Sequence, residues 1–229
     1  MWTIETFLPA QLMLIHFKQL RITNDRGAYD QLIQLAGELK RTYKNYSIGS
    51  IENVQAARRL FHAIRIDPTR RRPSSEALLN RALKGKEFFS VNSLVDVGNW
   101  CSLDFLLPIC IYDANKIIGT VTIRQGRESD AYLALNHQEI NFHQRYVIAD
   151  EQGAFGSPMT DSLRTAVDLN TTQAVLGIWA PADYASQRLQ QHAAVFAERV
   201  KKYCGGTVTQ LVNLRNPSET DLLGESKLR

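Results

Sequence analysis

Apolar residues recur three and four positions apart in several segments of the first half of the chain. The clearest sets run from Leu32 to Tyr43, from Val54 to Ile64 and from Leu78 to Leu83. This spacing puts the apolar side chains on one face, so it predicts three amphipathic helices. A serine, Ser74 or Ser75, could cap the third helix at its N-terminus.

A fourth helix is predicted from Asn92 to Leu107, where Pro108 ends it. After that proline the pattern changes to short β-branched and aromatic runs between turn residues, which indicates strands. These runs are 109–113, 117–124, 146–150, 174–179 and 207–214, and a last amphipathic helix carries Leu189, Ala193, Phe196, Val200 and Tyr203. Helices therefore dominate the first half and strands the second, which predicts an α+β fold with a mixed or antiparallel sheet.

The chain has 229 residues, which suits either one large domain or a domain with a small extension. We expect residues 1–50 to form a helical extension packed on the body, residues 51–215 to form the main domain, and residues 216–229 to be a frayed tail. The apolar run from Ile4 to Phe17 lacks the basic start of a signal peptide, so we expect it to pack on the domain. No stretch is long and apolar enough to span a bilayer, so we expect no membrane partner.

Cysteine and histidine usage argues against several kinds of site. The three cysteines are an odd number without CxxC spacing, which disfavours a disulfide framework or a cysteine zinc site and favours the cytoplasm. The five histidines are scattered, with only His137 and His143 close in sequence. GxSxG, Walker, HExxH and GxGxxG signatures are absent from the sequence. We therefore expect neither a bound metal nor a cofactor.

Positive charge is concentrated in one segment. The chain has a net charge of +4, whereas residues 58–86 hold nine Lys or Arg and only two Asp or Glu, a local charge of +7. A run of three arginines falls in a loop just before a predicted helix, where guanidinium groups and free backbone N–H groups suit phosphate. The candidate RNA- or phosphate-binding residues are Arg70, Arg71, Arg72, Arg81, Lys84 and Lys86. The alternative is a solvated helix face and loop.

Polar residues interrupt the apolar helix predicted after this segment. Asn92, Asp96 and Asn99 are four and three positions apart, so they share one face of the helix. Polar groups inside an apolar stripe need partners. They are therefore either the wall of a polar pocket or caps and buried hydrogen bonds.

Three segments together resemble the B3/B4 domain, the editing domain of the phenylalanyl-tRNA synthetase β chain, and in particular its free-standing relatives. In the first segment a polar helix leads through a proline to an aromatic–Asp strand end; its matching residues are Asn92, Val95, Asp96, Asn99, Leu103, Pro108, Tyr112, Asp113 and Ile117. The second, RYVIADEQG at 145–153, is similar to a later strand and turn of the family. The third, RPSSEALLNRALKGK at 72–86, resembles the free-standing proteins. The resemblance covers roughly residues 60–180.

The resemblance implies a B3/B4-like fold and a tRNA or aminoacyl-tRNA partner. It also implies an ester hydrolase that acts in trans on mischarged tRNA and positions a water beside the ester. Under this interpretation Asp161 or Asp113 orients the water. The expected substrate pocket comprises Asn92, Asp96, Asn99, Cys110, Ser75 and Glu76.

The chain departs from the family pattern at two places. Cys110 stands where the synthetases have a histidine, and a cysteine in an apolar strand is by default a small hydrophobe. The loop GSPMTDSLRT at 156–165 replaces a glycine-rich loop that carries a glutamate, and Asp161 is the nearest carboxylate. Two alternatives therefore stay open: a non-catalytic RNA-binding module, or a small-molecule pocket for a ligand such as an amino acid. The sequence does not indicate the oligomeric state.

Overall fold

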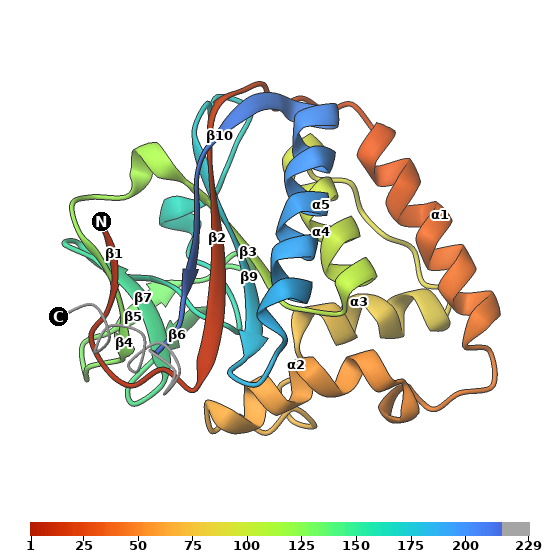
Figure 1. Ribbon diagram of the computed structural model, residues 1–229, viewed down its shortest axis with the longest axis horizontal. Coiled ribbons are helices and arrows are strands. Elements are labelled where there is room, and N and C mark those ends of the chain that lie inside the picture. Colours follow the sequence, from red (N-terminus) through yellow and green to blue (C-terminus); the bar gives the residue numbers. More distant parts are fainter. Residues whose placement is uncertain (217–229) are drawn as a thin grey trace, which may run out of the picture.

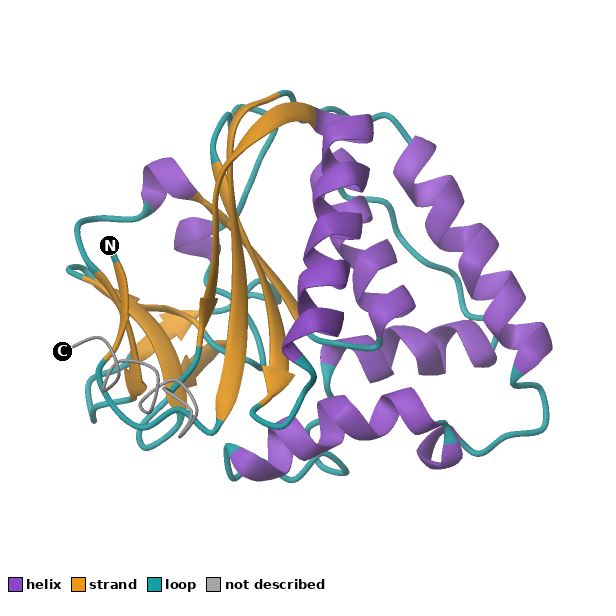
Figure 2. Cartoon of the chain, viewed as in Figure 1, coloured by secondary structure: helices purple, strands orange, loops and turns teal. Residues whose placement is uncertain are grey.

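Two four-stranded sheets pack face to face, and helices cover the other face of one of them (Figures 1 and 2). The computed structural model describes residues 1–216. The strands are β1 (Trp2–Ile4), β2 (Ala10–Leu20), β3 (Ile109–Asp113), β4 (Val121–Gln125), β5 (Ala131–Leu133), β6 (Glu139–Asn141), β7 (Tyr146–Asp150), β8 (Gly153–Gly156), β9 (Ala174–Pro181) and β10 (Gly205–Leu214). The α-helices are α1 (Gly27–Thr42), α2 (Glu52–Ala63), α3 (Ser74–Leu83), α4 (Ser93–Phe105) and α5 (Ser186–Cys204).

The central sheet has the strand order β10-β2-β9-β3, and all of its neighbouring strands are antiparallel. The second sheet has the order β1-β4-β7-β8, in which only the β1–β4 pair is parallel. Strands β5 and β6 form a separate hairpin. Strand β3 is therefore an edge of the central sheet, and its outer side is open to the loop that follows β8.

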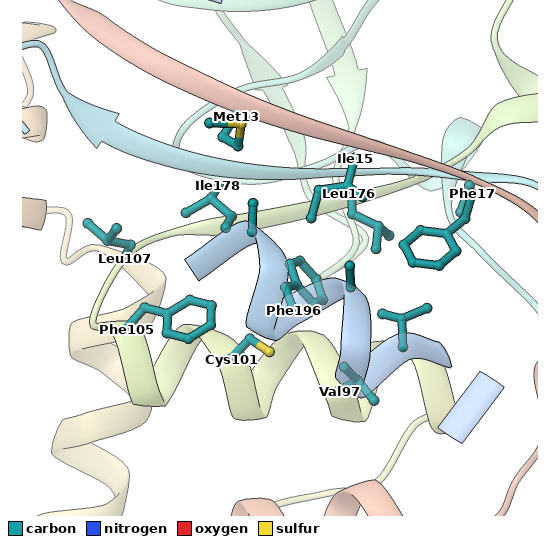
Figure 3. Packing of buried hydrophobic residues seen from close by; sticks show 14 of the residues in the cluster. Met13, Ile15, Phe17, Val97, Cys101, Phe105, Leu107, Leu176, Ile178 and Phe196 are labelled. Atoms are coloured by element: carbon teal, nitrogen blue, oxygen red, sulfur yellow. The ribbon is translucent and has the colours of Figure 1, made fainter. Parts of the chain in front are cut away.

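Strand β2 is buried on both faces. Met13, Ile15 and Phe17 pack against the layer of α4 and α5 (Figure 3), whereas Leu12 and Leu14 pack between the two sheets. Successive side chains of a strand point to opposite faces. A strand covered on both sides therefore reads as one continuous apolar run in the sequence.

The side chains of β3 also alternate between the two faces of the sheet. Ile109 and Ile111 lie on the side of the helices, and Cys110 and Tyr112 lie between the two sheets. A second helical layer, formed by α1, α3 and the start of α2, packs on the outer face of α4. The site described below lies where α3, α4 and β3 meet.

The α+β fold and the five helices predicted from periodicity are confirmed. The strands predicted at 109–113, 146–150, 174–179 and 207–214 are also confirmed, whereas β4 begins only at Val121. The structure differs from the predicted helical extension at residues 1–50, because its first part forms β1 and the central strand β2. Neither Ser74 nor Ser75 caps α3, since Pro73 occupies the cap position and no side chain bonds there. The predicted tail lies outside the described residues except for Asn216.

Within residues 1–216, no helix has both the length and the apolar character needed to cross a membrane.

Candidate functional site

A cavity of about 400 Å³ lies between α3, α4, the outer side of β3 and the loop after β8. Its walls are mostly aliphatic and carry one carboxylate. The lining residues are Ser74, Leu78, Val91, Val95, Gly98, Asn99, Ser102, Ile109, Ile111, Leu135, Asp161, Ala166 and Val167. A concave, mainly apolar site with a few polar groups is typical of small-ligand binding.

The sequence around α4 brings this helix close to β3. The Asn92 side chain caps the helix by accepting a 2.9 Å hydrogen bond from the Val95 N–H. At the other end Leu106 has a left-handed backbone with a φ of 54°, which stops the helix before the strand. A Cβ atom at Gly98 would lie 2.5 Å from the end of the Ile111 side chain, so a larger residue here would require Ile111 to shift.

Asp161 is held by groups of the neighbouring strand β3. The Tyr112 hydroxyl donates a 2.6 Å hydrogen bond to Asp161 Oδ1. Burial raises the pKa of Asp161 to about 7, and hydrogen bonds from Tyr112 and from the Ile111 amide oppose part of this rise. A carboxyl group with such a pKa exchanges its proton readily at neutral pH.

Gly156 makes this contact possible. A Cβ atom at this position would overlap the Tyr112 hydroxyl, so any larger residue would displace the phenol. Gly156 and Asp161 also form an isolated antiparallel bridge, which closes the intervening loop on itself. Burial raises the pKa of Tyr112 well above its usual value, and the nearby charge of Asp161 adds to this rise. The phenol therefore stays protonated and donates its hydrogen bond to Asp161.

The partners of Asp161 are neutral, in contrast to those of two other aspartates. Burial opposes ionisation of Asp130 and Asp150, yet hydrogen bonds from arginines lower the pKa of each carboxyl group. Arg124 lies 2.5 Å from Asp130, and Arg164 lies 2.9 Å from Asp150. Within residues 1–216 Asp161 has no such cation, so its charged form is the least compensated of the three.

Of the other predicted pocket residues, only Asn99 lines the cavity together with Asp161. Asn92 is used as the cap of α4. Asp96 is fully buried and accepts hydrogen bonds from the Ser90 hydroxyl at 2.5 Å and the Val91 N–H at 3.1 Å. The structure therefore separates three residues whose spacing indicated a common face.

Cys110 and Asp113 lie outside the cavity. Cys110 points between the two sheets, and burial raises the pKa of its thiol well above the usual range. Asp113 is the last residue of β3, where its carboxylate accepts a 2.7 Å hydrogen bond from the Thr171 hydroxyl and a 3.0 Å bond from the Asn115 N–H. Both residues stabilise their surroundings in this arrangement.

Ser75 and Glu76 lie in the first turn of α3 but face away from the cavity lining. Glu76, with a side chain only 1% exposed, accepts two 2.8 Å hydrogen bonds from Arg58 and lies 3.3 Å from Arg72. The Ser75 hydroxyl is buried without a hydrogen-bond partner among residues 1–216. Glu76 thus ties the arginine loop to α2.

The predicted basic residues form two groups at opposite ends of α3. Arg70, Arg71 and Arg72 precede the helix, whereas Arg81, Lys84 and Lys86 lie in its last turn or beyond it. A helix of ten residues is about 15 Å long, so the two groups do not form one compact patch. Only the first group is next to Ser74, which lines the cavity.

Two of the three arginines in the first group have an acidic neighbour, and Arg72 lies 3.3 Å from Glu76. The Arg70 side chain is 88% exposed and lies 3.8 Å from Asp67. Burial, together with the positive charge of Arg71, lowers the pKa of Arg145, just before β7. Arg71 and Arg145 are therefore close enough to repel each other, and among residues 1–216 neither has an acidic partner within ion-pairing distance.

The basic residues at the C-terminal end of α3 have different surroundings. The Arg81 guanidinium donates to the carbonyl oxygen of Glu87 and lies over the Phe89 ring, 5.7 Å from its centroid. Lys84 and Lys86 are exposed. Among residues 1–216, no group of three His, Cys, Asp or Glu side chains is arranged to hold a metal ion.

Sequence reasoning did not identify the Tyr112–Asp161 contact or the role of Gly156. The two bonded residues are 49 positions apart. Tyr112 stands out only as the aromatic residue before Asp113, and nothing in its local spacing indicates a distant partner. A strand pattern could have put Tyr112 on the face opposite to Ile111, but not beside Asp161.

Comparison with known proteins finds a matching family and several related proteins. The family model described as "B3/4 domain" matches residues 56–203. The phenylalanine–tRNA ligase beta subunit of Bartonella quintana (strain Toulouse) is 29% identical over 154 residues, which cover 56% of this chain and 19% of that protein. The corresponding subunit of Brucella suis biovar 1 is 36% identical over 76 residues, or 33% of this chain and 10% of that protein. The matches thus span at most about a fifth of these relatives.

A solved structure is also similar to this chain. It is an N-terminal fragment of the phenylalanyl-tRNA synthetase beta-subunit from Pyrococcus horikoshii, with a TM-score of 0.49 and 12% sequence identity. The match covers 95% of this chain and 54% of that one.

Proposed function

The chain belongs to the B3/4 domain family, and from that premise we propose that it binds tRNA and hydrolyses the ester of a wrongly attached amino acid. Its curated relatives are beta subunits of phenylalanine–tRNA ligase. The observation that carries the proposal is the cavity wall at Asp161, where a carboxylate with no cationic partner in the described part of the chain faces mainly aliphatic side chains. A cytoplasmic location fits this proposal and remains a prediction.

In the proposed reaction, water adds to the ester carbonyl carbon and the bond from that carbon to the ribose oxygen breaks. One proton of the water ends on the ribose oxygen, and the amino acid leaves as a carboxylate after losing the other. Asp161 orients the water, because its carboxylate can accept a hydrogen bond beside the reacting carbon. The Asn99 side chain, which also lines the cavity, supplies an amide donor for the carbonyl oxygen.

The arginines before α3 support the nucleic-acid part of the proposal. Arg70 is exposed, and Arg71 lies near Arg145 without an acidic partner among residues 1–216. Two guanidinium groups whose charges repel each other favour the binding of an anion near both. Because this loop leads directly into Ser74 at the cavity, RNA phosphates bound here would bring the aminoacyl end toward Asp161.

The test is a deacylation assay with purified protein and a panel of correctly and wrongly charged tRNAs. We expect release of the amino acid from at least one mischarged tRNA, and loss of that release in Asp161→Asn. The matched control is Asp168→Asn, on the same loop, whose carboxylate is exposed and lies 2.8 Å from Lys116. Full activity of Asp161→Asn, or no release from any charged tRNA, would refute the hydrolase proposal.

A second candidate is a tRNA-binding protein without hydrolytic activity. It is favoured by Cys110, which replaces the family's histidine and points between the two sheets rather than into the cavity. The two candidates differ in the same assay, because this one predicts salt-sensitive tRNA binding without release of the amino acid.

A further inference from the structure

Asp161 lines the cavity without a charged partner from the described part of the chain. Its hydrogen bonds come from the Tyr112 hydroxyl and the Ile111 amide, which are neutral donors. Among residues 1–216, no Lys, Arg or His side chain lies within ion-pairing distance of it. A carboxylate removed from water normally pairs with a cation or takes up a proton. Within residues 1–216 Asp161 therefore either takes up a proton or pairs with a cationic group that a ligand brings.

The carboxylate also has unused acceptor capacity. An ionised carboxylate has about four lone-pair sites, and the two donors from β3 fill about half of them. The remaining sites are available to a ligand or to water. An ammonium group carries three N–H donors and a full charge, which matches these sites better than a neutral hydroxyl does.

The rest of the lining indicates what else the ligand carries. Val95, Ile109 and Val167 contribute aliphatic surface. Ser102 uses its hydroxyl within the protein, in a 2.8 Å bond to a backbone carbonyl. Asn99 has no side-chain hydrogen bond among residues 1–216, so its amide is free to bind a carbonyl group. Among the described residues the lining contains no Lys or Arg, so it offers no cationic side chain to a second, negatively charged group of the ligand.

We propose that the cavity recognises an aminoacyl group by its free ammonium, which pairs with Asp161 while an aliphatic side chain lies against Val95, Ile109 and Val167. This inference rests on the proposed function, because it defines the substrate class of the same site. The substrate is an amine with an uncharged ester carbonyl, and its carbonyl oxygen faces Asn99. An aminoacyl group whose nitrogen is acylated is excluded.

This arrangement is compatible with the role of Asp161 in orienting water. The ammonium nitrogen and the ester carbonyl carbon are both bonded to the same α-carbon. A carboxylate that holds the nitrogen therefore also reaches a water beside the carbonyl carbon, using its remaining lone pair. The cavity volume of about 400 Å³ is at the small end of ligand sites, as a single amino acid requires.

Binding of small esters to the whole protein tests the inference without tRNA. L-leucine methyl ester and N-acetyl-L-leucine methyl ester share the side chain and the ester but differ in the ammonium. By calorimetry at pH 7 we expect the acetylated compound to bind at least about tenfold more weakly, the loss typical of a charge-assisted hydrogen bond. Equal affinity of the two esters would overturn the inference.

The variant Asp161→Asn tests whether Asp161 causes the difference in affinity between the two esters. In Asp161→Asn the difference between the two esters should disappear, whereas Asp168→Asn should keep it. If Asp161→Asn does not fold, the pH dependence of ester binding to the wild-type protein still tests whether Asp161 pairs with the ammonium. Affinity should fall below pH 7 as Asp161 takes up a proton, and above about pH 8 as the ammonium loses one. An affinity for the free amine that does not change with pH would contradict the proposal.

The binding and deacylation experiments test recognition of the ammonium and hydrolysis of the ester separately. Ammonium-dependent binding without deacylation of tRNA leaves the cavity specificity standing and removes the hydrolase. Deacylation that accepts N-acetylated aminoacyl-tRNA equally well leaves the hydrolase standing and removes the role of the ammonium.

Discussion

The Tyr112 hydroxyl donates a 2.6 Å hydrogen bond to Asp161 Oδ1, and this contact joins the space between the two sheets to the wall of the cavity. Tyr112 belongs to the core between the sheets, whereas its neighbour Ile111 faces the cavity. Asp161 lies at the open edge of β3 and is bonded by both residues. The edge position of β3 is what allows a single carboxylate to meet both a side-chain donor, the Tyr112 hydroxyl, and a backbone N–H of the same strand.

Stability should depend on pH through Asp161. Burial raises its folded pKa to about 7 from the usual 3.8, so between these pH values the folded state binds more protons than the unfolded state. The free energy of unfolding should therefore fall as pH rises through this window, by at most about 1.4 kcal/mol per pH unit from this group. Urea denaturation at pH 4.5, 6 and 7.5 should show a shallower decline in Asp161→Asn. Parallel declines in variant and wild type would contradict the assignment.

Tyr112→Phe should change the titration of Asp161 in a defined direction. The phenol hydrogen bond favours the carboxylate, so its removal should raise the pKa of Asp161 further. It should also reduce stability by about 1 kcal/mol, as expected when one hydrogen bond is removed. Carbon-13 NMR of Asp-labelled protein measures the pKa directly, and the acid limb of any deacylation profile should move to higher pH with it. A lower pKa in the variant would refute this role of Tyr112.

Gly156→Ala should disrupt the same contact from the opposite side. The added Cβ would overlap the Tyr112 hydroxyl, and such overpacking costs about 1–3 kcal/mol. The matched control is Gly37→Ala in α1, where the new Cβ would meet only the flexible end of Arg41 at 3.7 Å. That change should stabilise the helix by up to about 1 kcal/mol. Thermal unfolding of both variants tests the contrast, and equal melting temperatures would argue against a packed phenol at Gly156.

Local pattern was sufficient for most elements of this fold because each helix shows its apolar period and most strands show a β-branched run. It was misleading at residues 10–20, where a strand buried on both faces has no alternation to reveal it. The common spacing of Asn92, Asp96 and Asn99 was also an incomplete guide. Asn92 bonds the first turn of the helix and Asp96 bonds the residues just before it, so only Asn99 is left to line the cavity.

The candidate site could be predicted only in part, since its central contact is tertiary. Asp161 was identifiable as the nearest carboxylate in an unusual loop. Its partner Tyr112 was not, because the hydrogen bond depends on the edge position of β3 and on the space left by Gly156. Neither condition is visible in a stretch of sequence.

Glu76→Gln should destabilise the protein strongly. Glu76 is buried and neutralises Arg58 and Arg72, so the variant leaves two guanidinium groups without their counter-ion. The Arg58 and Arg72 side chains are 24% and 44% exposed, so the main cost is the loss of charge-assisted hydrogen bonds to Glu76, about 1.5–3 kcal/mol. The control is Glu198→Gln, because the Glu198–Lys201 pair is exposed and contributes less than about 1 kcal/mol. Chemical denaturation should separate the two variants clearly, and similar destabilisation of both would mean that Glu76 is not a buried anchor.

The two groups of basic residues at the ends of α3 should contribute unequally to tRNA binding. Arg70 and Arg71 precede the residue that lines the cavity, whereas Lys84 and Lys86 lie about 15 Å away along the helix. If phosphates bind at the first group, Arg70→Ala with Arg71→Ala should reduce the slope of log affinity against log salt by about 0.7–0.9 for each phosphate that the variant no longer neutralises. The paired control, Lys84→Ala with Lys86→Ala, should leave that slope nearly unchanged. Filter binding of tRNA over a range of salt concentrations measures both slopes. A larger effect from the lysine pair would move the RNA-binding surface to the C-terminal end of α3, and unchanged slopes in both variants would remove phosphate binding from this segment altogether.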